Sequence, residues 1–249
     1  MVTFGPALLL GGLAGLVAGS FLATLILRWP QGRSVMRGRS SCDGCGRVLG
    51  PHELVPLVSA LASGGKCRTC GTPIDSLHFS VELSCAAIGV LAAALSPGME
   101  GAGWALLGWL LLTLAILDWR HFWLPDALTL PLAFLGLTVG PWLTPAAFAD
   151  RVIGAAAGYG ALLFLSLVYR RLRGRDGLGL GDAKLLAALG AWFGWQALPF
   201  ILLSAASMGL AIALATGRAT SAKARLPLGT FLAVAAIPGW IAASALLRI

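Results

Sequence analysis

Long apolar blocks separated by short polar segments run through most of the chain. Eight blocks can be drawn, at residues 6–28, 79–96, 102–118, 123–143, 152–169, 184–199, 200–217 and 227–247. A perpendicular transmembrane helix needs about 20 residues, so the shorter blocks have uncertain ends, and 184–217 can be divided differently around Pro199. The pattern predicts an all-α, polytopic membrane helical bundle of about eight transmembrane helices.

Composition supports this class. The chain is 58% hydrophobic and 11% charged, whereas soluble domains carry about 25% charged residues. The first apolar block lacks a basic segment before it, and its positive charges follow it. We therefore interpret it as an anchor in the lipid bilayer and not as a cleaved signal peptide.

The positive charges are distributed unevenly about the blocks. If the blocks alternate in direction, sixteen basic residues fall on one side of the membrane and only Arg151 and Arg248 on the other. The sixteen are Arg28, Arg33, Arg37, Arg39, Arg47, Lys66, Arg68, Arg120, Arg170, Arg171, Arg173, Arg175, Lys184, Arg218, Lys223 and Arg225. The positive-inside rule then predicts cytoplasmic basic loops and outside termini. This asymmetry explains the net charge of +8 without a nucleic-acid partner.

Residues 29–78 form the one sizeable polar insertion, and it contains four cysteines in two CxxC pairs. The cysteines are Cys42, Cys45, Cys67 and Cys70, with 21 residues between the pairs. Two such knuckles supply the four thiolates of a closed tetrahedral site, which predicts a structural Zn²⁺ in a small zinc-ribbon-like loop with four cysteine ligands. Gly44, Gly46 and Gly71 suit the turns of the knuckles.

Other interpretations of the cysteines remain open. Two disulfides are disfavoured in the cytoplasm, and an unmetallated redox pair is the further alternative. Cys85 lies within an apolar block and is expected to be a small buried hydrophobe. His52 and His78 are polar loop residues, spare ligands or substrate contacts.

Two aspartates lie where apolar blocks meet polar segments. Asp118 ends the third block and Asp182 opens the sixth, so the alternation of the blocks places both at the cytoplasmic side. Two close carboxylates share one proton, as an aspartyl protease dyad requires. Gly179 and Gly181 are expected to take positive φ and to allow close approach of a substrate. A helix N-terminus at Asp182 favours Asp182 as the charged partner and Asp118 as the protonated one.

Each acid also has a structural alternative. Asp182 could cap a helix, and Asp118 could mark an interface. Asp126 follows Pro125, a common helix start, so it is expected to be a cap or a substitute member of the dyad. Glu82 lies just inside the second block without an assigned role.

Taken together, these motifs resemble the type IV prepilin peptidases, the prepilin leader peptidase/N-methyltransferases. The resemblance rests on Gly15, Gly19-Ser20-Phe21-Leu22, Arg28-Trp29-Pro30, Arg39-Ser40-Ser41-Cys42, Gly64-Gly65-Lys66-Cys67-Arg68-Thr69-Cys70, Leu124-Pro125-Asp126 and Gly179-Leu180-Gly181-Asp182-Ala183-Lys184. It implies that Asp118 and Asp182 are the catalytic pair of an inner-membrane aspartyl endopeptidase. The substrates would be type IV prepilins or type II secretion pseudopilins, which lose a basic leader at the cytoplasmic face.

The resemblance also implies N-methylation of the new N-terminal residue with S-adenosylmethionine, to which the cysteine loop is linked. The domain organisation expected is an anchor at 1–28, the zinc-binding cysteine loop at 29–78 and the protease bundle at 79–249. The competing hypothesis is a transporter or assembly scaffold with a zinc-ribbon docking loop. Acids that relay ions should lie deep in the spans, whereas Asp118 and Asp182 lie at the span ends.

Overall fold

The structure is a computed structural model that describes residues 4–36, 39–174, 177, 179–217 and 226–247. Six of the basic residues counted above lie outside these ranges. They are Arg37, Arg175, Arg218, Lys223, Arg225 and Arg248. The chain forms two compact units, residues 1–109 and residues 110–249.

Every regular element among the described residues is a helix, apart from two isolated β-bridges. The α-helices are α1 (Phe4–Arg28), α2 (Val58–Ala62), α3 (Ser76–Leu95), α4 (Met99–His121), α5 (Asp126–Thr138), α6 (Phe148–Arg173), α7 (Leu180–Phe193), α8 (Leu198–Ala215) and α9 (Leu228–Leu247). Short 3-10 helices are η1 (Trp29–Gln31), η2 (Pro51–Leu54), η3 (Gly140–Trp142) and η4 (Trp195–Ala197). The bridges pair Ser41 with Val48 and Lys66 with Pro73.

Each of the eight apolar blocks has a helix, but six helices in the described residues are long and apolar enough to cross a membrane. The exceptions are α5 and α7, with 13 and 14 residues. At a rise of about 1.5 Å per residue each is about 20 Å long, less than the roughly 30 Å hydrocarbon core. The expected helical membrane bundle is therefore confirmed, with six spanning helices and two shorter apolar ones in place of about eight spans.

Glycine and proline set the end of α7 and the start of α8. Gly194 follows α7 and takes φ +81°, which ends the helix at Phe193. Pro199 lies in the first turn of α8, where a missing N–H costs no intrahelical hydrogen bond. Pro199 therefore opens α8, whereas the sequence had placed it at the boundary that ends the sixth block.

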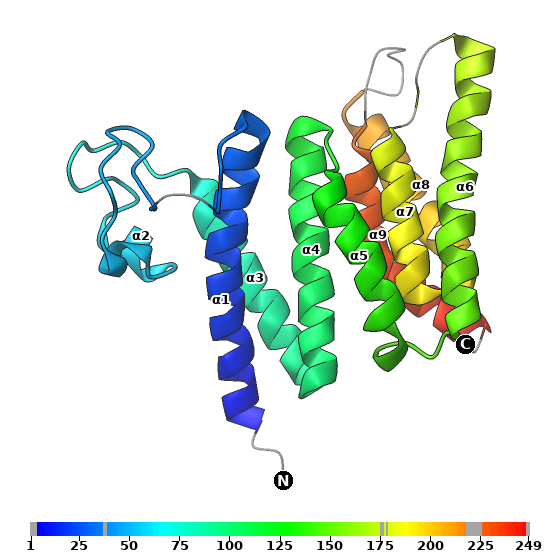
Figure 1. Cartoon of the computed structure of the whole chain (residues 1–249), viewed down its shortest axis with the longest axis horizontal. Coiled ribbons are helices and arrows are strands. Elements are labelled where there is room, and N and C mark those ends of the chain that lie inside the picture. Colours follow the sequence, from blue (N-terminus) through cyan, green and yellow to red (C-terminus); the bar gives the residue numbers. More distant parts are fainter. Residues whose placement is uncertain (1–3, 37–38, 175–176, 178, 218–225, 248–249) are drawn as a thin grey trace. The chain divides into compact units, whose positions relative to one another are not determined.

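In the first unit, α1 and α3 lie side by side (Figure 1). Gly11, Gly15 and Gly19 recur on one face of α1, and a Cβ at any of them would collide with α3 backbone. Gly89 of α3 meets Gly11 in the same way. Small residues at this spacing let two helix backbones pack closely in a membrane. The Cys loop (residues 29–75) connects the two helices.

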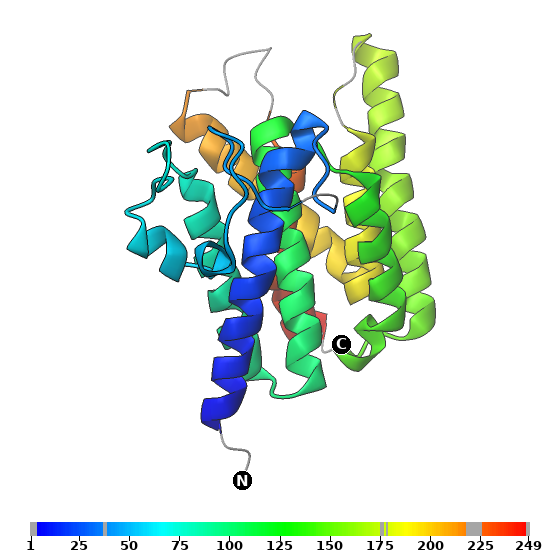
Figure 2. The same ribbon diagram turned by 60° about the vertical axis from the view of Figure 1, so that its left-hand side comes forward.

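In the second unit, α7 is the most enclosed helix. It packs between α5 and α6 and also contacts α9 (Figure 2). Ten of its 14 residues are buried, from Asp182 to Phe193. A short helix buried on nearly every side has a fixed position, so the residue in its first turn is held rigidly.

Arg151 of α6 is completely buried in this unit. Its guanidinium donates hydrogen bonds to the carbonyl oxygens of Gly140, Thr144 and Ala191, among others. It also bonds the carbonyl of Trp192, in the last turn of α7. A cation at this helix end offsets the macrodipole and satisfies carbonyls that lack intrahelical partners. The sequence had treated Arg151 as one of two basic charges on the outer side.

The domain limits expected at 1–28, 29–78 and 79–249 stay a prediction, and the two compact units divide the chain at a different place. Because α1 packs against α3, the first anchor, the Cys loop and the second apolar helix form one body. The continuous helix α4 begins in the first unit and ends in the second.

Candidate active site and metal centre

Asp118 and Asp182 come together in the second unit, and we call them the acid pair. Asp118 lies in the last turn of α4 and Asp182 in the first turn of α7, with 5% and 9% of their surfaces exposed. Their carboxylates interact electrostatically with one another. The backbone N–H of Gly229, in α9, interacts with both. Three helices that are far apart in sequence therefore converge on one pair of carboxylates.

Thr230 fixes the orientation of the Asp118 carboxylate. Its backbone N–H donates to Asp118 Oδ2 over 2.7 Å, and its hydroxyl lies 3.2 Å from the same oxygen. The hydroxyl is also 2.9 Å from the carbonyl oxygen of Ala115. Both Thr230 contacts are therefore to the same carboxylate oxygen, Oδ2.

Asp182 is held by its own helix start. It is the third residue of α7, and its Oδ2 accepts a hydrogen bond from the Gly179 N–H over 3.3 Å. The expectation of positive φ at Gly179 and Gly181 is wrong. Gly179 has φ −76°, and Gly181 lies inside α7. Instead, Gly181 allows Leu124 to pack closely against α7, because a Cβ at position 181 would lie 2.8 Å from the Leu124 side chain.

Asp126 is the first residue of α5, as its Pro-Asp sequence predicts. Its carboxylate accepts a hydrogen bond from Lys184 Nζ over 2.6 Å, and its side chain is 57% exposed. This ion pair ties the start of α5 to the first turns of α7. The described contacts thus join Asp126 to Lys184, while Asp182 interacts with Asp118.

Gly229 and Thr230 were not found from the sequence. They are more than 100 residues from Asp118 and carry no titratable group. The only signal is the segment Pro227-Leu228-Gly229-Thr230 at the start of the last apolar block. A Cβ at Gly229 would lie 3.0 Å from Asp118 Oδ2, so this position must stay small.

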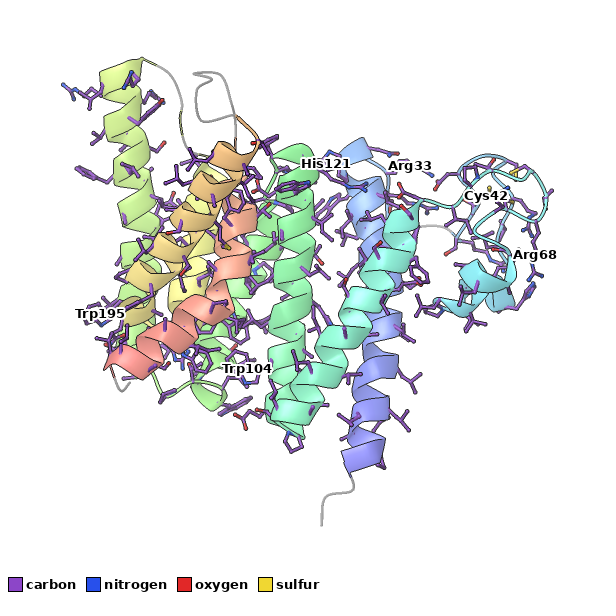
Figure 3. The ribbon with its side chains drawn as sticks, turned by 180° about the vertical axis from the view of Figure 1, so that it is seen from behind. Arg33, Cys42, Arg68, Trp104, His121 and Trp195 are labelled. Atoms are coloured by element: carbon purple, nitrogen blue, oxygen red, sulfur yellow. The ribbon has the colours of Figure 1, made fainter. Side chains whose placement is uncertain are left out.

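The four cysteines of the Cys loop form one cluster in the first unit. Their sulfur atoms all lie within 4.8 Å of one another, and those of Cys42 and Cys70 are 3.7 Å apart. A tetrahedral zinc site with Zn–S bonds of about 2.3 Å has sulfurs about 3.8 Å apart. The donor set therefore fits a tetrahedral metal ion. Figure 3 shows Cys42 and Arg68 in this loop.

The two knuckles have the same backbone design. The carbonyl oxygen of Cys42 accepts a hydrogen bond from the Gly46 N–H, and the carbonyl oxygen of Cys67 accepts one from the Gly71 N–H, each over 2.9 Å. Gly46 and Gly71 take φ +71° and +72°, a conformation that strains residues with a Cβ. The expected role of these two glycines is confirmed. Gly44 instead packs against Thr72.

The thiol pKa values show why the cluster suits a cation. Backbone hydrogen bonds from Cys70 and Thr69 lower the pKa of Cys67 to about 6. For Cys45 the Arg47 backbone N–H also favours the thiolate, but hydrogen bonding with Cys70 and desolvation outweigh it and raise the pKa to about 11. The opposite pKa shifts of Cys67 and Cys45 disfavour ionisation of both thiols together, and a bound metal ion would remove that conflict.

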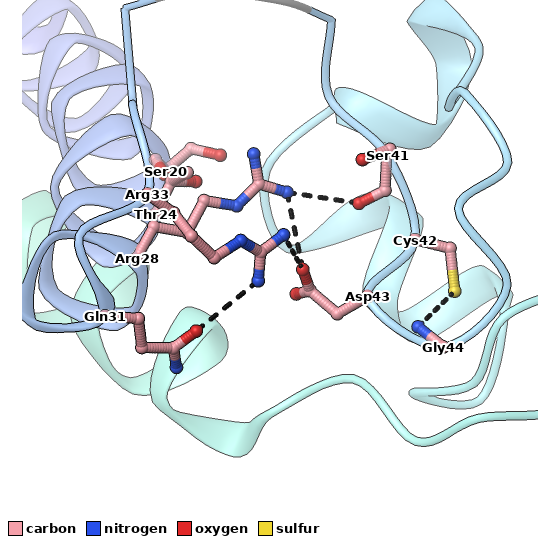
Figure 4. Close-up of polar contacts among 9 residues, drawn as sticks. All are labelled: Ser20, Thr24, Arg28, Gln31, Arg33, Ser41, Cys42, Asp43 and Gly44. Carbon is pink, nitrogen blue, oxygen red and sulfur yellow. Dashed lines mark hydrogen bonds and ion pairs between the residues drawn. The ribbon is translucent and has the colours of Figure 1, made fainter.

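Ion pairs attach the cluster to its surroundings. Arg33 and Arg28 place guanidinium nitrogens 2.7 and 3.7 Å from Asp43 Oδ1, and Arg28 also donates to the Ser41 carbonyl (Figure 4). Arg47 makes a bidentate pair with Glu53, whose pKa falls to about 2 because of these hydrogen bonds. The loop is therefore anchored to the end of α1 by charge, since none of its described short helices has a buried residue.

The remaining sequence-based expectations are met in part. Cys85 is fully buried, which confirms its role as a small hydrophobe. His78 is the third residue of α3 and not a loop residue, whereas His52 lies in η2 of the loop. Neither histidine is in the metal-ligand cluster.

The fold and the acid pair define a helical membrane protein with two buried, interacting carboxylates at the ends of its helices. The type IV leader peptidase family matches residues 105–214, and the bacterial peptidase A24 N-terminal domain matches residues 13–95. The gap between the two matches contains part of α4, near the boundary of the two units. The chain belongs to the type IV leader peptidase family.

Several relatives carry the name prepilin leader peptidase/N-methyltransferase. The one from Burkholderia pseudomallei is 45% identical over 78% of this chain, which spans 64% of that relative's length. The one from Aeromonas hydrophila is 41% identical over 84% of this chain, and the match covers 72% of that relative's length. The one from Pseudomonas aeruginosa is 34% identical over 92% of this chain, and the match covers 87% of that relative's length. No solved structure matches the chain significantly.

Proposed function

We propose that this protein is a membrane aspartyl endopeptidase that removes the leader from type IV prepilins or type II secretion pseudopilins. We further propose that it methylates the new N-terminal residue with S-adenosylmethionine. The acid pair supports the first activity, and the names of the relatives support both. The protein would act at the cytoplasmic face of the bacterial inner membrane, where the positive-inside rule places its basic loops.

The observation that carries the proposal is the meeting of Asp118 and Asp182 around one backbone N–H. In the hydrolysis, the ionised carboxylate removes a proton from water while the protonated one donates a hydrogen bond to the scissile carbonyl. The hydroxide adds to the carbonyl carbon, and the leaving amine then takes a proton as the C–N bond breaks. Asp118 would act through Oδ1, because Thr230 occupies Oδ2.

Membrane depth explains how a substrate reaches these acids. The leader of a prepilin is basic and so are the loops of this protein, so charge attraction does not bring them together. A prepilin is anchored by an apolar helix whose leader junction lies at the membrane surface. Both acids lie at ends of helices, and a shared depth would align the scissile bond with them.

The first unit would hold the groups that methylation needs. The cysteine cluster would bind a structural Zn²⁺, because its four sulfurs leave no position open for substrate. S-adenosylmethionine, when bound, supplies an electrophilic methyl group for the new N-terminal amine. The residues of this chain would bind the donor and the amine side by side and keep the amine unprotonated.

The protease is tested with Asp118→Asn and Asp182→Asn, made separately and assayed for leader removal from a prepilin by mass spectrometry. We expect each to lower the cleavage rate at least about a hundred-fold, because each removes a group that moves a proton. Asp126→Asn is the matched control. It changes a carboxylate at the neighbouring helix start but keeps an acceptor for Lys184, so most activity should remain.

A normal rate in either dyad variant would refute the assignment. A loss confined to Asp126→Asn and one dyad variant would instead identify Asp126 as the substitute partner. Methylation is read from the same spectra as one added methyl group that requires S-adenosylmethionine.

A further inference from the structure

A polar cavity of about 210 Å³ lies within the first unit, between the Cys loop and the adjoining ends of α1 and α3. Helix α1 contributes Ser20 and Thr24, and helix α3 contributes His78 and Glu82. Six of the 24 described residues that line it are apolar. The many charged and hydroxyl side chains of this lining suit a ligand with several polar groups.

Glu82 is the carboxylate of this cavity with the fewest described partners. The residue is 6% exposed, and its Oε2 accepts one hydrogen bond, from the Leu57 N–H over 2.8 Å. Among the described residues it has no cationic partner within ion-pair distance. A buried carboxylate without a positive partner is costly, so a positively charged ligand in the cavity would stabilise it.

The other carboxylates of the cavity already have partners. Glu53 pairs with Arg47, and Asp43 pairs with Arg28 and Arg33. Asp75 caps α3 by accepting the Leu77 N–H. Glu82 therefore provides an unmatched negative charge at the innermost wall, where α3 enters the apolar region.

The backbone at Leu57 is consistent with a built site. Leu57 has φ 58°, which is rare for a residue with a branched side chain. The bond to Glu82 holds this turn, and the turn starts the short helix α2. Ser59 and Ala60 of α2 form part of the cavity wall. Strained backbone of this kind persists where the surroundings fix it, often at binding sites.

We propose that this cavity binds S-adenosylmethionine and that the Glu82 carboxylate faces a positive charge of the bound donor. This inference rests on the proposed methyltransferase activity and locates its donor site. The donor is a zwitterion with an extra sulfonium charge, and the cavity offers both the Glu82 carboxylate and the side chains of Lys66 and Arg68. Serine and threonine hydroxyls in the wall provide partners for its ribose and amino-acid groups.

The cavity also explains why the cysteine cluster matters for methylation. Cys42 and Cys67 are part of its lining. A metal ion bound by the cysteines would not touch the donor but would fix the wall that encloses it. The donor and the metal would therefore be coupled through the shape of the loop.

The test is calorimetric titration of S-adenosylmethionine into the full-length protein in lipid nanodiscs. Glu82→Gln keeps an acceptor for the Leu57 N–H and removes only the charge, so we expect Kd to rise at least about tenfold. Glu100→Gln makes the same change at an exposed site outside the cavity and should leave Kd within about twofold. Metal content is measured on each sample.

A second pair of variants tests the space itself. Ser59→Trp would fill the cavity from α2 and abolish donor binding, whereas Leu61→Trp adds the same bulk at a residue that is 71% exposed and should not. If Glu82→Gln also lowers the metal content, the comparison of Ser59→Trp with Leu61→Trp decides whether the donor occupies the cavity, because neither change alters a charge or a cysteine.

Unchanged donor affinity in both Glu82→Gln and Ser59→Trp, in a protein that still methylates pilin, would overturn the site and leave the proposed function intact. Weakened binding of a mature pilin peptide with unchanged donor affinity would assign the cavity to the acceptor amine and also overturn the inference. A wild-type protein that neither binds the donor nor methylates would refute the methyltransferase itself. Leader cleavage would still be tested separately by the dyad variants.

Discussion

The two units build their functional groups in opposite ways. In the second unit, the acid pair lies at the ends of packed helices, and α7 is buried along most of its length. In the first unit, the cysteines lie in a loop whose described short helices contain no buried residue. The acid pair is thus positioned by close packing, whereas the cysteine loop depends on turns, ion pairs and the metal its cysteines could bind.

Because of this difference, the two sites should respond differently to loss of a metal ion and to loss of helix packing. Close packing holds the acid pair without any cofactor, since each helix is fixed by its neighbours. A loop without a core must offset its ordering entropy in another way, and a metal ion does so. Disturbances of the metal should therefore affect methylation, and disturbances of the packing should affect cleavage.

Metal removal should give the largest effect. Replacing Cys45 and Cys70 together by serine, one from each knuckle, should eliminate the metal and lower methylation at least about a hundred-fold, because metal binding and loop folding are one equilibrium. Leader cleavage by the same protein should fall by less than about tenfold. Both products are measured in one mass-spectrometric assay.

Cys85→Ala is the matched control for this change. It removes a buried thiol that lies outside the cluster, so metal content and methylation should persist. Equal losses of cleavage and methylation in the double variant would show that the two units do not differ as described.

Arg151 provides the corresponding test in the second unit. Arg151→Met leaves the carbonyls of Gly140, Thr144 and Trp192 without these hydrogen bonds in a buried site. We expect the free energy of unfolding to fall by about 3 kcal/mol. Thermal unfolding in detergent, followed by tryptophan fluorescence, measures this change.

Arg171→Met is the control, because Arg171 is exposed near the other end of the same helix. Its effect should stay within about 0.5 kcal/mol. A similar stability for both variants would show that the buried guanidinium contributes no more than a surface charge.

Much of the helical architecture follows from the sequence. Apolar blocks locate every helix of the bundle, because a segment in lipid must satisfy its own backbone. Hydropathy does not place the ends of α5 and α7, since α5 is followed by the 3-10 helix that starts at Gly140 and α7 ends before Gly194. It also could not show that Arg151 is buried, because a charge beside an apolar block looks the same whether it faces water or six carbonyl oxygens.

The candidate sites divide in the same manner. The spacing of the cysteines predicts their cluster, because two CxxC turns bring four sulfurs together almost wherever they meet. The acids could be paired only through topology, and the residues that orient them are not titratable. Thr230 is a contact between α9 and α4 that no local pattern records, so it became visible only with the tertiary structure.

Thr230 supports the smallest prediction and the finest test of the packed site. Its single hydroxyl proton can go to the Ala115 carbonyl or to Asp118 Oδ2, so the hydroxyl can either donate to a charged Asp118 or accept from a protonated one. Thr230→Val removes this hydroxyl and keeps the shape and the backbone N–H bond. We expect kcat for leader cleavage to fall about fivefold with KM unchanged, the size of one hydrogen bond. Thr230→Ser should restore kcat, whereas a loss that serine does not restore, or a change in KM alone, would show that Thr230 acts through packing and not through the acid pair.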